Sequence, residues 1–162
     1  MVAMSATLTE QLTSGKDFES FEQQAFLSIV YTADGLMLEL GRLLKEQGLS
    51  PALYNVLRIL RGAGHDGLRC GEVAERLLNR VPDVTRLLDR LERLDLVTRR
   101  RPDEDRRIVR VRVTDRALDL LGGLDQPVRD LHAGQLGHLK PRDRRDLLRL
   151  LRRARDRSES DA

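Results

Sequence analysis

Apolar residues recur at steps of three and four along most of the chain, which is the spacing of one face of an α-helix. The first such segment occupies residues 17–47, and its apolar pattern starts at Phe18 and forms two adjacent stripes. The first stripe comprises Phe21, Ala25, Ile29, Ala33, Leu36, Leu40 and Leu43, and the second comprises Phe26, Val30, Met37 and Leu44. Gly48 suits the left-handed position that often ends a helix. The pattern predicts a long helix with a wide apolar face.

Two shorter helical segments follow. Ser50 and Pro51 are typical of an N-cap and a first turn. The apolar positions of this second helix are Leu53, Val56, Leu57 and Leu60. The glycine-rich stretch RGAGHDGLRC, residues 61–70, then turns the chain and passes through a short extended piece at Leu68 and Arg69. In the third helix, GEVAERLL, we expect Val73, Ala74 and Leu77 to be buried.

A fourth helical segment, PDVTRLLDRLERLDLV, has Pro82 in its first turn. Its inward stripe comprises Val84, Leu87, Leu88, Leu91 and Leu94, and its outward face comprises Asp83, Arg86, Arg90 and Arg93. The period then becomes that of a strand, because Val109, Val111 and Val113 alternate with Ile108, Arg110 and Arg112. With residues 96–99 as the partner strand, residues 100–107 become the tip of a β-hairpin.

Two more helices follow the hairpin. Thr114 caps the fifth, TDRALDLLGGL, with Asp115 in its first turn, and the apolar pattern continues to Leu139. We expect a kink or break where Gly122, Gly123 and Pro127 fall inside this helix. The last helix carries Leu147, Leu150, Leu151 and Ala154. Residues 1–16 and 158–162 are polar and aperiodic, which predicts tails around a single domain over 17–157.

Composition narrows the class of protein. Charged residues make up 34% of the 162-residue chain, yet the net charge is only +3, so the basic character is local. The single cysteine excludes an intramolecular disulfide. We expect a cytoplasmic protein, because no stretch approaches the roughly 20 apolar residues of a membrane span and the N-terminus lacks the pattern of a secretion signal.

Positive charge gathers in the stretch TRRRPDEDRRIVRVRVTD, residues 98–115, where seven arginines surround three consecutive acids. Arg99, Arg100 and Arg101 lead into the hairpin tip, and Arg106 and Arg107 lead out of it. The acids between them can hold the guanidiniums in place by paired hydrogen bonds until a phosphate group is met. The stretch predicts a negatively charged partner.

The order of these elements is typical of a winged helix-turn-helix. In that fold a helix enters the major groove of B-DNA, where base edges carry a distinguishable hydrogen-bonding pattern, and a basic hairpin follows the backbone into the minor groove. We therefore predict a mainly α fold with a small β-hairpin wing. The winged core spans residues 49–116, and residues 17–47 and 115–157 are dimerisation helices, since their apolar surface exceeds what a winged domain of about 70 residues can cover.

Within residues 49–116 the sequence resembles the MarR-type transcriptional regulators. The resemblance rests on GEVAERL, on VTRLLDRLERLDLV and above all on DRRIVRVRVTD, which matches that family's wing pattern. It implies a homodimer that binds a palindromic operator in double-stranded DNA, usually as a repressor released by a small effector. It also implies that Arg107 enters the minor groove, that Asp105 orients it, and that Thr85 and Arg86 approach bases and phosphates.

The remaining expected DNA-binding residues are Arg80, Pro82, Asp83, Arg90, Arg101 and Arg106. For Arg90 and Arg93 a merely solvated face is an equal alternative, because Asp89 can pair with Arg93 at the i,i+4 spacing. Two positions depart from the family pattern. Asp95 stands where a glycine is usual, which aspartate can replace because it tolerates left-handed geometry. Lys140 stands where a serine or threonine cap is commoner, so the last helix should begin less firmly.

An effector pocket is expected where the first helix, the second helix and the start of the fifth meet. Phe26 and Val30 would line it, Tyr54 would form an amphipathic wall and Arg58 would anchor a carboxylate of a small aromatic or phenolic effector. The alternative is that these residues fill the core. Two other functions stay open: a winged-helix module that binds protein, and a DNA-compacting protein without sequence choice.

Other chemistry has little support in the sequence. Cys70 could sense oxidants, but a half-buried structural cysteine is the commoner case. His65, His132 and His138 form no tight cluster with other ligands, which argues against a metal site. No pairing of nucleophile and base, glycine-rich phosphate loop or pair of carboxylates suggests catalysis. We expect no cofactor and no enzymatic activity.

Overall fold

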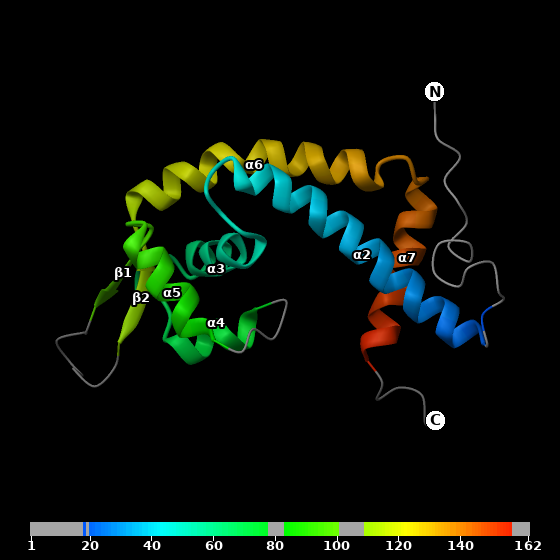
Figure 1. Ribbon diagram of the computed structural model, residues 1–162, viewed down its shortest axis with the longest axis horizontal. Helices are drawn as coiled ribbons and strands as arrows, with labels where there is room; N and C mark the ends of the chain where they lie inside the picture. Colours follow the sequence, from blue (N-terminus) through cyan, green and yellow to red (C-terminus); the bar gives the residue numbers. More distant parts are fainter. Residues whose placement is uncertain (1–17, 19, 78–82, 101–108, 157–162) are drawn as a thin grey trace. The chain divides into compact units, whose positions relative to one another are not determined.

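The computed structural model describes residues 18, 20–77, 83–100 and 109–156 of the chain. The chain divides into two compact units, Met1–Gly48 and Leu49–Ala162. The described residues of the first unit form a long helix, α2, over Phe21–Lys45 (Figure 1). It begins after Ser20, whose hydroxyl accepts a hydrogen bond of 3.1 Å from the backbone N–H of Gln23. Gly48 has φ +70°, so the predicted left-handed cap is confirmed.

The second unit begins with a helical core. Helix α3 spans Pro51–Gly62, the 3-10 turn η1 spans Gly64–Asp66, α4 spans Cys70–Arg76 and α5 spans Val84–Arg93. Ser50 caps α3 as predicted, and its hydroxyl accepts from the backbone N–H of Leu53. At the start of α4 the Glu72 carboxylate accepts a 2.7 Å hydrogen bond from the backbone N–H of Arg69. That bond is the main reason that the pKa of Glu72 lies below its usual value.

The wing consists of two antiparallel strands, β1 over Val97–Arg100 and β2 over Arg110–Val113. Leu68, just before α4, adds an isolated bridge to Val111 on the other side of β2. Of the three alternating valines, only Val111 is fully buried, while Val109 is exposed. Leu68 covers only the middle of β2, which explains why the predicted burial of the whole strand face was too broad.

Two helices complete the second unit, α6 over Asp115–Leu136 and α7 over Pro141–Arg155 (Figure 1). Thr114 caps α6, as predicted, by accepting from the backbone N–H of Ala117. Of the kink or break predicted at Gly122, Gly123 and Pro127, the break is wrong, because α6 continues through all three residues. Leu124 and Val128 are buried on either side of the proline, and burial of about 1.5–3 kcal/mol each offsets its cost of roughly 3 kcal/mol. Lys140 gives α7 no side-chain cap hydrogen bond, and the less firm start expected for this helix stays a prediction.

Leucine and valine fill the core of the second unit, which centres on α3. Its fully buried side chains include Leu53, Val56, Leu57, Leu60, Val73, Leu88, Leu91, Val97, Val111 and Leu121. Two predicted core positions are wrong: Ala74 is exposed, and Leu94 is 38% exposed because α5 ends at Arg93. Within the described residues, no helix is long and apolar enough to cross a membrane.

Candidate nucleic-acid interface

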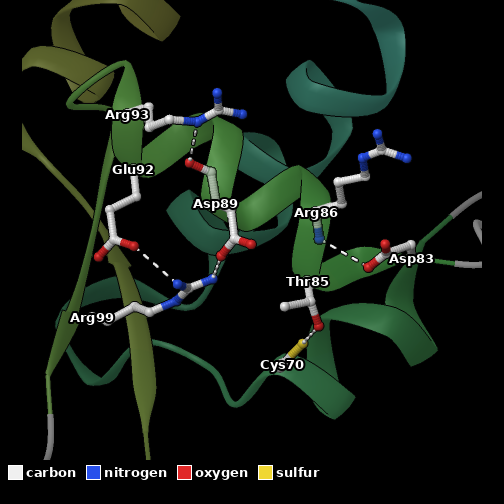
Figure 2. Close-up of polar contacts among 8 residues, drawn as sticks. All are labelled: Cys70, Asp83, Thr85, Arg86, Asp89, Glu92, Arg93 and Arg99. Atoms are coloured by element: carbon white, nitrogen blue, oxygen red, sulfur yellow. Dashed lines mark hydrogen bonds and ion pairs between the residues drawn. The ribbon is translucent and has the colours of Figure 1, made fainter.

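Helix α5 begins with a side-chain cap. The Asp83 carboxylate accepts a 2.9 Å hydrogen bond from the backbone N–H of Arg86 (Figure 2). This bond satisfies one of the free N–H groups in the first turn, so it fixes where the helix starts. Of the residues predicted at this entrance, Asp83 is exposed in this position, whereas Arg80 and Pro82 lie outside the described residues.

The two faces of α5 differ sharply in polarity. Val84, Leu88 and Leu91 are buried, at the three- and four-residue spacing that anchors one face of a helix. Thr85, Arg86, Arg90 and Arg93 are exposed. In the part of the chain that the structure describes, no acidic side chain forms an ion pair with Arg86 or Arg90. Their guanidiniums can therefore bind a phosphate or a base edge without first breaking an internal pair.

Asp89 does not form the ion pair that its spacing predicts. Arg93 donates through Nε to the backbone carbonyl of Asp89 at 3.4 Å, and the Asp89 carboxylate accepts instead from Arg99 of β1 (Figure 2). The Arg99 guanidinium also donates to Glu92, with 2.9 Å between Nη1 and Oε2. The hydrogen bond to Asp89 is the main reason that the pKa of Arg99 is raised. Sequence spacing missed this contact because it crosses the turn between α5 and β1.

The turn from α5 to β1 depends on Asp95. Its φ is +57°, so the left-handed geometry expected where the MarR pattern has glycine is confirmed. The Asp95 carbonyl accepts a 2.9 Å hydrogen bond from the Thr114 hydroxyl, and the Leu96 backbone N–H donates to the Leu91 carbonyl. Thr114 thus joins this turn to the start of α6 as well as capping that helix.

The base of the wing is held on its other side by Arg110. Its Nη1 donates to the carbonyl of Gly67 at 3.1 Å. Gly67 has φ +64°, and an added Cβ would clash with the Val111 carbonyl, so only glycine allows this approach. The predicted wing residues Arg101, Asp105, Arg106 and Arg107 lie outside the described residues.

Cys70 lies beside the exposed face of α5. Its Sγ is 3.7 Å from Oγ1 of Thr85, and its side chain is half-buried where α4 meets α5 (Figure 2). The sequence carries no signal of this contact, since the two residues are 15 positions apart on different helices. Among the described residues, no group of three or more His, Cys, Asp or Glu side chains could hold a metal ion.

The four expected effector residues are divided between the two units. In the second unit, the Tyr54 side chain is only 7% exposed. Its hydroxyl accepts a 3.1 Å hydrogen bond from Nη1 of Arg58, and the Arg58 guanidinium lies 5.9 Å from the centroid of the Tyr54 ring. In the first, Phe26 and Val30 are 64% and 48% exposed on α2. Arg58 is thus partly engaged by Tyr54, and the pocket stays a prediction.

The order of α3, α4, α5 and the β1–β2 hairpin defines a winged helix-turn-helix protein. Comparison with known proteins agrees with this class. The family model described as MarR family matches residues 47–108. A solved MarR transcription factor from Planctomyces limnophilus is 39% identical, with 84% of this chain and 98% of that chain covered and a TM-score of 0.63. This chain therefore belongs to the MarR family of winged-helix transcriptional regulators, which is not a family of enzymes.

Two further relatives mark how far the similarity extends. The transcriptional repressor MdtR of Bacillus subtilis is 36% identical over 72 residues, which are 44% of this chain and 45% of that protein. The chain spans about half the length of the curated relatives it matches. A structure of S. aureus MepR with DNA has a TM-score of 0.72 at 19% identity, with 85% and 97% of the two chains covered, and so shows the same fold.

Proposed function

We propose that this protein is a homodimeric repressor that binds a palindromic operator in double-stranded DNA. The observation that carries the proposal is the exposed face of α5, where Arg86 and Arg90 have no internal acidic partner among the described residues. A helix that is fixed by a cap, anchored by buried leucines and lined with unpaired arginines suits the major groove. Arg107 as the minor-groove residue, with Asp105 to aim it, remains part of the proposal from the family pattern.

A homodimer accounts for apolar surface that one chain leaves uncovered. Exposed large apolar side chains include Phe21, Phe26, Ile29 and Leu38 on α2, and Leu147, Leu148 and Leu150 on α7. Several large exposed apolar side chains on one helix usually pack against a partner. In this proposal, residues 17–47 and 115–157 form the dimer contacts, and residues 49–116 contact DNA. The site of action would be the cytoplasm.

We further propose that a small aromatic or phenolic effector releases the protein from its operator. A regulator that shares this fold at 17% identity, with a TM-score of 0.78, was solved with 2,4-dichlorophenol bound. In this chain the exposed Arg58 guanidinium lies against the buried Tyr54 ring, so a cation that could bind an acidic effector stands beside an aromatic side chain. A screen of small aromatic acids and phenols should yield a compound that both raises the melting temperature and weakens operator binding.

The test is selection from a randomised duplex library, followed by titration of the selected duplex against a scrambled competitor. The proposal predicts an enriched inverted repeat and a preference of at least about 10³-fold over the scrambled duplex. Equal affinity for both duplexes would favour a DNA-compacting protein. Absence of binding to either would favour a protein-interaction module.

A further inference from the structure

Helix α6 contains a segment that is weak as a helix. Gly122 and Gly123 each favour the helical state less than alanine by roughly 0.8–1 kcal/mol. Pro127, four residues after Gly123, has no N–H to donate to the Gly123 carbonyl. One stretch of six residues thus combines two flexible positions with a missing backbone hydrogen bond. An isolated helix of this sequence would bend here first.

A charged pair from another helix meets α6 within this stretch. Arg61, in the last turn of α3, donates from Nη1 to Oδ2 of Asp125 at 2.9 Å and from Nη2 to Oδ1 at 2.8 Å. The two parallel hydrogen bonds fix direction as well as distance. The side chains are 27% and 29% exposed, so water only partly competes for the pair. The hydrogen bond between them raises the pKa of Arg61 and lowers that of Asp125.

The two halves of α6 differ in how they are held. Before Asp125, the helix buries Ala117, Leu121 and Leu124. After it, Val128 alone is buried in the remainder of the helix, which leads on to α7. The bond between Arg61 and Asp125 thus lies close to the end of the firmly packed half.

We infer that the Arg61–Asp125 pair braces a hinge in α6 and thereby determines which half-site spacing the protein accepts. The inference rests on the proposed function, in which the far half of α6 and α7 join two copies. Residues 126–136 extend about 17 Å. A bend of about 10° at the hinge would therefore shift their far end by roughly 3 Å, close to the 3.4 Å between successive bases of one strand. One added base pair moves a half-site by about this distance and rotates it by about a tenth of a turn, so a hinge that bends freely should accept more than one spacing.

The glycines make the inference testable, because alanine stiffens a helix without adding new contacts. An added Cβ at Gly122, Gly123 or Gly134 would meet nothing within 4 Å. Gly134 is in the same helix, seven residues beyond Pro127, and provides a matched control. Each replacement stabilises the helix, but only the first two stiffen the proposed hinge.

The experiment titrates full-length variants against three duplexes: the selected inverted repeat and the same repeat with its central spacer lengthened or shortened by one base pair. The parent should prefer its own spacing by at least about tenfold, and Arg61→Gln should reduce that preference to threefold or less. Adding Gly122→Ala and Gly123→Ala to Arg61→Gln should restore most of the preference, whereas adding Gly134→Ala should not. Circular dichroism and size measurements confirm that each variant is a folded dimer.

Three outcomes would overturn the inference while leaving the proposed function intact. Arg61→Gln could weaken binding to all three duplexes by one common factor, which would make the pair only a stabilising contact. Gly134→Ala could restore the preference as well as the hinge alanines do, which would make the effect one of general helix stability. Should Arg61→Gln fail to fold, Arg61→Lys serves instead, because lysine keeps the charge but not the paired hydrogen bonds. An unchanged spacing preference in Arg61→Lys would reject the brace.

If the parent does not distinguish operator from scrambled DNA, the proposed function itself fails and the inference with it.

Discussion

Arg99 of β1 and Asp89 of α5 are joined by a hydrogen bond of 2.5 Å between Nη2 and Oδ1. The same guanidinium donates to Glu92, so one arginine of the wing forms ion pairs with two acidic side chains of α5 (Figure 2). Arg99 was expected among the arginines that lead into the hairpin tip. Its engagement makes it instead a link between the two elements that the proposed function brings to the duplex.

Replacement of Arg99 should weaken DNA binding only in a protein that retains the carboxylates of Asp89 and Glu92. Arg99→Gln should cost about 1 kcal/mol of operator affinity, because the half-exposed Asp89 and Glu92 limit what the pair contributes. In an Asp89→Asn, Glu92→Gln background the same change should cost almost nothing. Arg100→Gln, at the exposed neighbouring position, is the control and should have the same effect in both backgrounds. An undiminished Arg99→Gln effect in the neutral background would mean that Arg99 contacts DNA itself.

Asp95 should be a site where glycine stabilises the fold. Its φ of +57° strains any residue with a Cβ, and the Thr114 hydroxyl binds only its backbone carbonyl. Asp95→Gly should raise the free energy of unfolding by about 0.5–1 kcal/mol, whereas Asp95→Val should lower it by at least about 1 kcal/mol. Urea denaturation measures both changes. A lower free energy of unfolding for Asp95→Gly would show that the aspartate side chain outweighs the backbone strain.

The link at Arg99 and the turn at Asp95 show which features could be predicted from the sequence and which could not. Local signals were sufficient for the caps at Ser50 and Thr114 and for the left-handed turn at Asp95, because each depends on residues within a few positions. The partner of Asp89 could not be predicted in this way. Helical spacing offers Arg93, and only the folded turn brings Arg99 closer.

Packing between helices explains the other differences between the predicted and the observed structure. Pro127 favours a break when it is considered alone, but the buried residues on both sides of it hold α6 together. The contact between Cys70 and Thr85 and the pair between Arg61 and Asp125 join different helices. The periodicity that identifies each helix contains no information on which residue of another helix it meets. Helix existence and capping were therefore predictable, whereas these contacts required the structure.

The cap of α5 should be replaceable by any short side chain with a hydrogen-bond acceptor. Asp83→Ala should lower the free energy of unfolding by about 1 kcal/mol, since the Arg86 N–H loses its acceptor. Asp83→Asn should retain most of the stability, and Asp119→Ala, at an exposed position on α6, controls for loss of a surface charge. Urea denaturation of the three variants gives the comparison. Equal effects of Asp83→Ala and Asp83→Asn would show that charge, and not the cap, determines the result.

The Arg61–Asp125 pair should make the free energy of unfolding depend on pH in the acidic range. The hydrogen bond from Arg61 holds the pKa of Asp125 below its usual value. The folded state therefore favours the ionised carboxylate, and its contribution is complete above the unfolded pKa of about 3.9 and is lost as the pH falls through the lower folded value. Stability measured by urea denaturation from pH 7 to pH 3 should fall less steeply in Asp125→Asn than in the parent. Identical slopes below pH 4 would contradict the assignment.

The exposed face of α5 should contact base edges of the operator through Arg86. A competition titration compares the parent and Arg86→Ala on the selected operator and on a scrambled duplex, at several salt concentrations. We expect Arg86→Ala to lose about 1–3 kcal/mol on the operator and much less on the scrambled duplex, and to relax the choice at one position of each half-site. Unchanged operator affinity with an unchanged salt dependence would contradict it, because α5 would then not be the element that meets the duplex.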